Sequence, residues 1–368
     1  MSDVEVADAV ETATLEQMSD MDIDNVYELM DVQLRERPDP VDLYRRWERQ
    51  NWSVFDLDFT RDIQDWGRMP TLLKGDLLFS LSGFFLGEAA VTDTLSPLVH
   101  AAPTDDDRHF LATQLVDEAR HTVFFTRFFR EVLGISSIEA AKTSIEPVRV
   151  WTSDEGGFGV LFYKHLSDVT DAVRMDPPDY GKWVDGIVFY HMLLEGMLAL
   201  QGQRNILQGA RLFGVLPAFR AGFTAVTRDE SRHVNYAVYA LSKAIEAGHE
   251  ERVLETIHRY LDATCDVLSK PIRRFPTPTP EDLAELQAFL HAGSTPPQRN
   301  LRELLGNPVL QLQKRLRAAG VSAAPLESIA TQWWARIEAN FDLYEQRFGE
   351  THPARVQERT ASTIGSAR

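Results

Sequence analysis

The sequence LVDEARH at residues 115–121 recurs almost unchanged as TRDESRH at residues 227–233. Both copies contain the pattern Asp-Glu-x-Arg-His, so a Glu and a His stand three residues apart in each. On an α-helix this spacing places a carboxylate and an imidazole on one face, where both can reach the same metal ion. The repeat therefore predicts two helices that each bring one Glu-x-x-His pair to a metal site: Glu118 with His121, and Glu230 with His233.

Two further glutamates lie in strongly apolar surroundings, Glu88 within FFLGEAAV and Glu195 within HMLLEGML, with no Lys or Arg close by in sequence. Buried carboxylates are costly unless they are protonated, paired or bound to metal. Carboxylate and imidazole ligands suit iron and manganese better than zinc. Two single glutamates and two Glu-x-x-His pairs are also the ligand set of di-iron and di-manganese helical bundles. The sequence thus predicts six metal ligands: Glu88, Glu118, His121, Glu195, Glu230 and His233.

The Glu-x-x-His spacing occurs twice more, at Glu246 with His249 and at Glu255 with His258. Both pairs lie in the polar segment IEAGHEERVLETIHRY, and both lack the Asp and the Arg of the repeated pattern. We interpret them as solvent-exposed helix faces.

Composition limits the classes of function that this chain can have. Of its 368 residues, 44% are hydrophobic, which is enough for a substantial core. The formal net charge of −17 argues against binding to nucleic acid or to an anionic membrane. The single cysteine, Cys265, excludes an intrachain disulfide framework and a site built from cysteine ligands. No apolar run reaches the length of a membrane span, so a soluble protein of the reducing cytoplasm is expected.

Apolar residues recur at helical spacing through most of the chain, and no segment has the pattern of a strand. Residues 1–35 are acidic and have no signal-peptide features, and we predict a disordered tail there. Residues 36–348 are predicted to form one helical domain, and residues 349–368 a polar C-terminal tail. Four long helices should each carry part of the ligand set: Met69–Val99, Asp105–Leu133, Tyr180–Phe213 and Leu216–Ala247.

The six ligands resemble those of the ferritin-like dimetal carboxylate superfamily, and specifically of its ribonucleotide reductase small-subunit branch. The segment NWSVFDLDFTRD at residues 51–62 also resembles that branch, with Trp52 at the place of its buried tryptophan. The resemblance implies an all-α fold, a ferritin-like four-helix bundle with additional flanking helices. Because metal-bound histidines usually donate their other N–H to a carboxylate, we expect Asp229 to orient His121, with Trp52 nearby, and Asp117 to orient His233.

Three positions distinguish the members of that branch. Phe125, four residues after His121, stands where the usual small subunit has its radical tyrosine, so a stored tyrosyl radical is not expected. Val91 and Tyr190 resemble the valine and tyrosine that are joined by an ether cross-link in the ligand-binding oxidases similar to this small subunit. Ordinary core packing is the alternative explanation for these two residues.

The resemblance to those oxidases implies an enzyme that activates dioxygen for C–H oxidation and holds a long-chain fatty acid. It implies a homodimer and one manganese and one iron per chain, with a di-iron centre as the alternative. Manganese would be bound by Glu88, Glu118 and His121, and iron by Glu195, Glu230 and His233.

The main alternative is a tyrosine-free ribonucleotide reductase small subunit, which Phe125 and Trp52 also fit. Against it, the sequence TASTIGSAR at residues 360–368 lacks the acidic, aromatic docking peptide of such subunits, and Tyr344 matches their tail tyrosine poorly. An iron-storage or lipid-carrying bundle that uses the metals structurally is a non-enzymatic alternative. His191, four residues before Glu195, is either a seventh ligand or a ring that bonds to a neighbouring helix.

Overall fold

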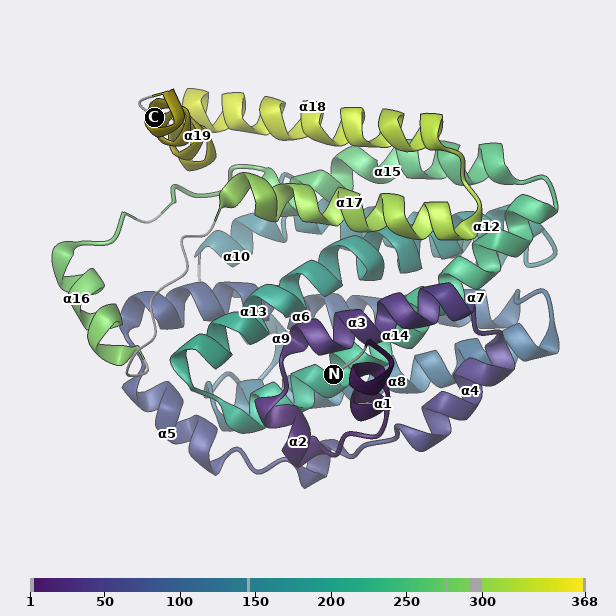
Figure 1. Cartoon of the computed structure of the whole chain (residues 1–368), viewed down its shortest axis with the longest axis horizontal. Helices are drawn as coiled ribbons and strands as arrows, with labels where there is room; N and C mark the ends of the chain where they lie inside the picture. The colour runs from purple at the N-terminus through teal and green to yellow at the C-terminus, as the bar shows by residue number, and fades with distance from the viewer. Residues whose placement is uncertain (1–2, 144–145, 276, 291–299, 367–368) are drawn as a thin grey trace.

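The computed structural model describes residues 3–143, 146–275, 277–290 and 300–366, and within these ranges the chain forms helices and no strand (Figure 1). This confirms the predicted all-α class. Four long helical segments form the centre of the bundle and carry the predicted ligands. They are α6 (Thr71–Thr94), α8 (Asp105–Glu131), the continuous segment α12 (Tyr180–Ile187), η3 (Val188–Ala199) and α13 (Leu200–Phe213), and α14 (Pro217–Glu246).

The two helices that carry the repeat have well-defined starts. In α8 the hydroxyl of Thr104 accepts a hydrogen bond from the Asp107 backbone N–H. Three aspartates in the first turn add a favourable interaction with the positive end of the helix dipole. In α14, Pro217 occupies the first turn, and the Asp62 carboxylate accepts from the N–H groups of Ala218 and Phe219. These caps fix where each repeat lies along its helix.

The third central segment is not a regular α-helix, although its sequence predicted one continuous helix. Its middle part, η3, is a π-helix of 12 residues, and Glu195 lies within it. Residues 180–213 are long and apolar enough to cross a membrane by length and composition, but 89% of the relevant window is buried within the fold. The segment is therefore the interior helix of the bundle.

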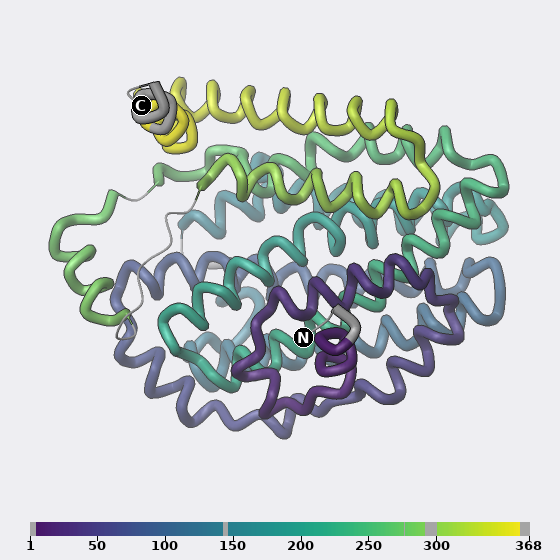
Figure 2. Tube along the Cα trace, viewed as in Figure 1, coloured from purple at the N-terminus to yellow at the C-terminus, as the bar shows by residue number. Residues whose placement is uncertain are grey.

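Shorter and outer helices surround this centre, as predicted (Figure 2). Those before α14 are α4 (Pro40–Arg49), η1 (Val54–Asp56), α5 (Thr60–Arg68), α7 (Ser96–His100), α9 (Ile138–Thr143), α10 (Glu146–Trp151), the π-helix η2 (Gly159–His165) and α11 (Leu166–Met175). Those after it are α15 (Glu250–Ser269), α16 (Pro280–Phe289), α17 (Leu301–Ala319), α18 (Ala323–Phe348) and α19 (Pro353–Ser366).

The prediction of a disordered N-terminal tail is wrong for the residues that the structure describes. They form α1 (Asp3–Glu11), α2 (Leu15–Asp20) and α3 (Ile23–Glu36), which lie across the bundle in purple in Figure 1 and contact α14. Val26 and Leu29 are fully buried, while the acids of these helices face outward. The segment is rich in acids, but its apolar residues have amphipathic helical spacing and pack against the core.

The C-terminal segment is also more ordered than a polar tail. Helix α19 begins at Pro353, Ala354 is buried, and Arg355 forms ion pairs with Glu338, Asp342 and Glu345 of α18. Polar side chains here hold the helix to its neighbour instead of leaving it in solvent.

Candidate metal centre

The structure brings all six predicted ligands together in the interior of the bundle, each with at most 6% of its surface exposed. They form two groups that share Glu118 and Glu230, and within each group the ligand atoms lie within 4.8 Å of one another. The first group is Glu88, Glu118, His121 and Glu230; the second is Glu118, Glu195, Glu230 and His233.

In the first group the imidazole of His121 points its Nδ1 atom at three carboxylates. This atom lies 3.4 Å from Glu88 Oε2, 3.5 Å from Glu118 Oε2 and 3.7 Å from Glu230 Oε1. These distances leave the nitrogen without a hydrogen-bond partner. The centre of the group is therefore a space surrounded by one nitrogen and three oxygen donors.

The second group repeats this arrangement around His233. Its Nδ1 atom lies 3.4 Å from Glu118 Oε1, from Glu195 Oε1 and from Glu230 Oε2. Thus Glu118 and Glu230 each direct one oxygen to each imidazole, which is the disposition expected of carboxylates that bridge two ions.

Several donor atoms of the site have no hydrogen-bond partner within the protein and are free to bind metal ions. The Nδ1 atoms of both histidines and one oxygen each of Glu118, Glu195 and Glu230 are buried without a hydrogen-bond partner. Buried polar atoms are normally paired, and each unpaired one costs free energy. Two cations would satisfy all of these atoms at once, so the residues present fit a pair of carboxylate- and imidazole-bound metals.

The acid–base properties of the site also favour bound cations. Burial raises the pKa of Glu88 to about 8 and that of Glu195 well above its ordinary value. Burial also opposes ionisation of Glu118, but the nearby imidazoles of His121 and His233 overcome this effect and lower the pKa of Glu118 to about 2. Four adjacent carboxylates can therefore not all be ionised without positive charge among them, and metal ions would supply it.

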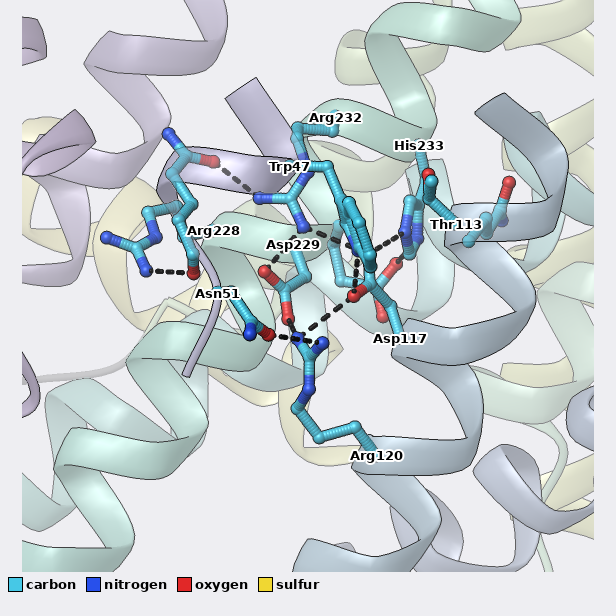
Figure 3. A network of polar contacts seen from close by, with 12 residues as sticks. Trp47, Asn51, Thr113, Asp117, Arg120, Arg228, Asp229, Arg232 and His233 are labelled. Carbon is cyan, nitrogen blue, oxygen red and sulfur yellow. Dashed lines mark hydrogen bonds and ion pairs between the residues drawn. The ribbon is translucent and has the colours of Figure 1, made fainter. Parts of the chain in front are cut away.

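Each histidine is held from behind by the aspartate of the other repeat. His121 Nε2 lies 3.3 Å from Asp229 Oδ2. His233 Nε2 lies 3.2 Å from Asp117 Oδ2, and Figure 3 shows this second contact. With Nε2 directed to a carboxylate, Nδ1 is left free to face the site, so these contacts set the orientation of both rings.

Two arginines of the repeat connect the two aspartates, and Figure 3 shows them between the helices. Arg232 donates to Asp117 Oδ2 at 2.9 Å and to Asp229 Oδ1 at 2.7 Å, and Arg120 donates to Asp117 Oδ1 at 3.0 Å and to Asp229 Oδ2 at 3.3 Å. Although burial opposes it, Arg232 above all holds the pKa of Asp229 well below its ordinary range. Asp229 is thus kept as an anion beside His121.

A tryptophan donates to each aspartate. Trp52 Nε1 lies 2.8 Å from Asp229 Oδ2, and Trp47 Nε1 lies 2.9 Å from Asp117 Oδ1. Trp52 was predicted from the sequence and Trp47 was not. The two aspartates occupy equivalent places in the repeat. By this symmetry Trp47, five residues before Trp52, could have been assigned as the partner of Asp117.

His191 lies outside both ligand groups. Its Nε2 atom is 2.8 Å from Gln114 Oε1, and Gln114 Nε2 donates to Glu195 Oε1 at 2.8 Å. Burial lowers the pKa of His191 to about 3, so the ring is neutral. Of the two roles considered for His191, the structure shows the bond to a neighbouring helix. Gln114, which precedes Glu118 by one helical turn, was missed, and that spacing on α8 was the available signal.

A cavity of about 280 Å³ opens from the four glutamates, and Val91 and Tyr190 both line it. The Tyr190 hydroxyl is buried and has no hydrogen-bond partner. Apart from the acids, Ser80 and Asn205, the lining is mostly aromatic and apolar and includes Phe79, Phe84, Trp151, Phe158, Phe162, Leu194 and Leu198. Phe125 is fully buried and packs against the rings of Phe84 and Phe223, so no tyrosine occupies that place beside His121.

No protein-family model matches the chain. Solved structures that resemble it include R2-like ligand-binding oxidases. The oxidase from Sulfolobus acidocaldarius has a TM-score of 0.56 and 21% identity, over 79% of this chain and 93% of its own. An oxidase variant with an anaerobically reconstituted Mn/Fe cofactor has a TM-score of 0.52 and 22% identity, over 80% of this chain and 91% of its own.

The chain has the fold of the R2-like ligand-binding oxidases. A second variant, with an aerobically reconstituted Mn/Fe cofactor, gives the same result, with a TM-score of 0.53 and 23% identity over 80% of this chain and 92% of its own. The predicted ferritin-like architecture is therefore confirmed, and the two ligand groups lie in the interior of an R2-like bundle.

Proposed function

We propose that this chain is a dimetal oxidoreductase that activates dioxygen for C–H oxidation, of the kind represented by the R2-like ligand-binding oxidases. One observation carries the proposal. Two buried ligand groups share Glu118 and Glu230, and the carboxylates of both groups face an apolar cavity large enough for a ligand. A site that only stabilised the fold would need no such cavity.

By the resemblance, manganese is bound by Glu88, Glu118 and His121 and iron by Glu195, Glu230 and His233, with di-iron as the alternative loading. The Mn/Fe cofactors of the similar oxidases support this assignment. The bound metal pair supplies the oxidising power for breaking a C–H bond. The protein holds both imidazoles through Asp117 and Asp229, and it excludes water through the apolar lining.

The proposed ligand is a long-chain fatty acid, bound with its carboxylate toward the metals and its chain along the cavity. The aromatic and aliphatic lining of the cavity matches an alkyl chain, because its burial there removes apolar surface from water. The ligand-binding character of the similar oxidases supports this choice. On the basis of the resemblance we extend the proposal to a homodimer, and the single cysteine, Cys265, supports the cytoplasm as its location.

We further propose an ether cross-link between Tyr190 and Val91. Both residues line the cavity next to the glutamates, and the Tyr190 hydroxyl has no other partner. In this reaction the phenolic O–H bond and one C–H bond of the valine side chain break, and one O–C bond forms. The two electrons and two protons pass to dioxygen, so the protein loses two hydrogens.

A tyrosine-free ribonucleotide reductase small subunit is the second candidate, and the contact of Trp52 with Asp229 behind His121 favours it. The shared cavity position of Val91 and Tyr190 favours the oxidase. Reductase activity on mixing with a cognate large subunit would establish the second candidate.

The deciding experiment is metal counting and intact-mass analysis of protein matured in air with manganese and iron, followed by peptide mapping. The oxidase predicts one manganese and one iron per chain and a loss of two hydrogens in a linked pair of peptides that hold Val91 and Tyr190. The Tyr190→Phe variant is the control and should keep the metals without the mass loss. Unlinked wild-type peptides with the same metals would favour the reductase subunit, and protein without metal would refute both.

A further inference from the structure

The π-helix η3 ends at Ala199, one turn after the ligand Glu195, and the return to α-helical bonding leaves one backbone carbonyl without a partner in the helix. The Leu200 N–H donates to the carbonyl of Glu195, five residues back, whereas α13 continues with the bonding of an ordinary α-helix. When bonding returns from a five-residue to a four-residue step, one carbonyl is passed over, and here it is that of Gly196. A buried carbonyl without a donor is costly, so a donor from elsewhere is expected.

Arg315 of α17 supplies this donor. Its Nη1 donates to the Gly196 carbonyl, its Nη2 lies 3.4 Å from the sulfur of Met30, and only 1% of its surface is exposed. Burial lowers the pKa of Arg315 to about 10, which leaves the guanidinium charged at neutral pH. Within the described part of the chain no carboxylate forms an ion pair with it. An isolated buried charge is expensive, so its retention calls for a specific role.

Tyr27 of α3 makes a similar contact, one helical turn further along the segment formed by η3 and α13. Its hydroxyl donates to the carbonyl of Leu200, four residues after Gly196 and therefore on the same face. Around these two polar contacts Met30, Leu200 and Val234 form a small buried cluster against which Tyr27 packs. Val234 directly follows His233, so the cluster contacts the helix of the second ligand group as well. Figure 2 shows that α3 and α17, which are distant in sequence, lie on the same side of the bundle.

Gly196 permits the close approach of the guanidinium. A Cβ atom at this position would lie 2.9 Å from the His191 carbonyl oxygen and 3.4 Å from Arg315 Nη1. The widened helix and the arginine thus fit each other only where residue 196 has no side chain. Glu195, the preceding residue, directs its carboxylate toward His233, whose Nδ1 lies 3.4 Å from Glu195 Oε1.

We propose that Arg315 and Tyr27 are positioning residues for the second ligand group, and that they hold the π-helical register of residues 188–199 by donating to the carbonyls of Gly196 and Leu200. A slip of one residue in a helix turns each side chain by about 100° around the axis, which would carry Glu195 away from Glu230 and His233. The inference concerns ligands of the proposed function and rests on it only for the identity of the bound group. The two contacts, from Arg315 to the Gly196 carbonyl and from Tyr27 to the Leu200 carbonyl, are present in the protein without metal, and we call them the clamp.

The test compares Arg315→Gln and Tyr27→Phe with wild type by amide hydrogen exchange in metal-free protein and by titration with Mn²⁺ alone. Arg347→Gln is the control for the loss of an arginine–carbonyl contact, because Arg347 donates to the carbonyl of Pro271 at 2.9 Å but is exposed and lies in α18. Tyr27→Phe removes a single hydroxyl, so it keeps the test informative if Arg315→Gln does not fold. Arg315→Lys keeps a cationic donor and should lie closer to wild type.

We expect Arg315→Gln to speed exchange of the amides in residues 196–201 by about tenfold or more while the other helices stay protected, since the opening is local. The Mn²⁺ affinity of the second ligand group should fall by about 10- to 100-fold, as it does when other residues that support a metal ligand are replaced. The affinity of the first group should stay within about twofold. Tyr27→Phe should change the same amides less. Equal exchange in Arg315→Gln and Arg347→Gln, or a uniform rise over all helices with equal loss of both affinities, would overturn the proposal. If wild type binds no metal the proposed function fails, and the exchange pattern still decides on the clamp.

Discussion

Asp117 on α8 and His233 on α14 contact each other through Oδ2 and Nε2 at 3.2 Å, although 116 residues separate them in the chain. The contact between Asp229 and His121 is its counterpart from the other copy of the repeat. Each copy thus supplies the acid that orients the imidazole of the other. This reciprocity explains why the whole pattern Asp-Glu-x-Arg-His is repeated and not only its two ligands.

From this reciprocity we predict that Asp117→Asn weakens the ligand group that contains His233. The amide cannot hold the Nε2–H of His233 as a carboxylate does, so one of two metal affinities should fall by about 10- to 100-fold. Titration with Mn²⁺ measures this. Asp266→Asn is the matched control, because Asp266 is also buried and ion-paired, with Arg336, but lies in α15. An equal effect of both changes would contradict the assigned role.

A second prediction concerns His191. Because its Nε2 bonds to Gln114 and it lies in neither ligand group, His191→Gln should leave two metal ions bound per chain. The affinity should change by less than about tenfold, since only the outer support of Glu195 through Gln114 is disturbed. Metal counting after dialysis checks the stoichiometry. Loss of one ion would show that His191 is a ligand after all.

The sequence predicted what depends on local spacing. The six ligands and the two orienting aspartates belong to short motifs, so a helical periodicity was enough to place them on inward faces. Trp47 and Gln114 were missed although the symmetry of the repeat and the spacing on α8 were available signals. Arg315 could not be found in this way, because it acts only through a contact between distant parts of the chain. The same holds for the π-helix around Glu195, since its widened bonding leaves the apolar pattern of residues 188–199 unchanged.

The N-terminal helices show a different reason for failure. Ile23, Val26, Leu29 and Met30 have the spacing of a helix face, and all four are buried. Composition suggested disorder because acids outnumber them in the segment. What stabilises it is a set of contacts with the core, including the Arg228 guanidinium, which donates to the carbonyls of Val10 and Ala13. Such partners are not visible from the segment alone.

A third prediction uses two glycines of α6 that line the cavity. At Gly83 a Cβ atom would lie 2.6 Å from the Trp151 ring, whereas at Gly87 it would lie 3.5 Å from Phe162, an ordinary contact. Gly83→Ala should therefore destabilise the fold by about 1–3 kcal/mol through overpacking. Gly87→Ala should be neutral or stabilising by up to about 1 kcal/mol, because alanine loses less backbone entropy in a helix. Urea unfolding measures both free energies, and a reversed order would contradict the cavity geometry.

The last prediction concerns pH and lies outside the metal centre. His352 is buried, stacks on Phe341 with ring centres 3.9 Å apart, and accepts the Ala354 N–H through Nδ1 at the start of α19. Burial, and then the charge of Arg355, lower the pKa of His352 to about 4, although Glu345 and Glu338 act in the opposite direction. The unfolded segment takes up a proton near the ordinary pKa of about 6.5, so protonation favours detachment.

The stabilisation from neutral His352 is therefore complete above about pH 6.5 and is lost as the pH falls toward 4. We expect hydrogen exchange of α19 to accelerate over this window, after correction for intrinsic exchange, while α8 and α14 keep their protection. In His352→Phe the ring can still stack but cannot take up a proton, so α19 should be somewhat less protected at pH 7 and should show no further loss over the same window. An identical pH dependence in the variant would mean that another group controls the docking of α19.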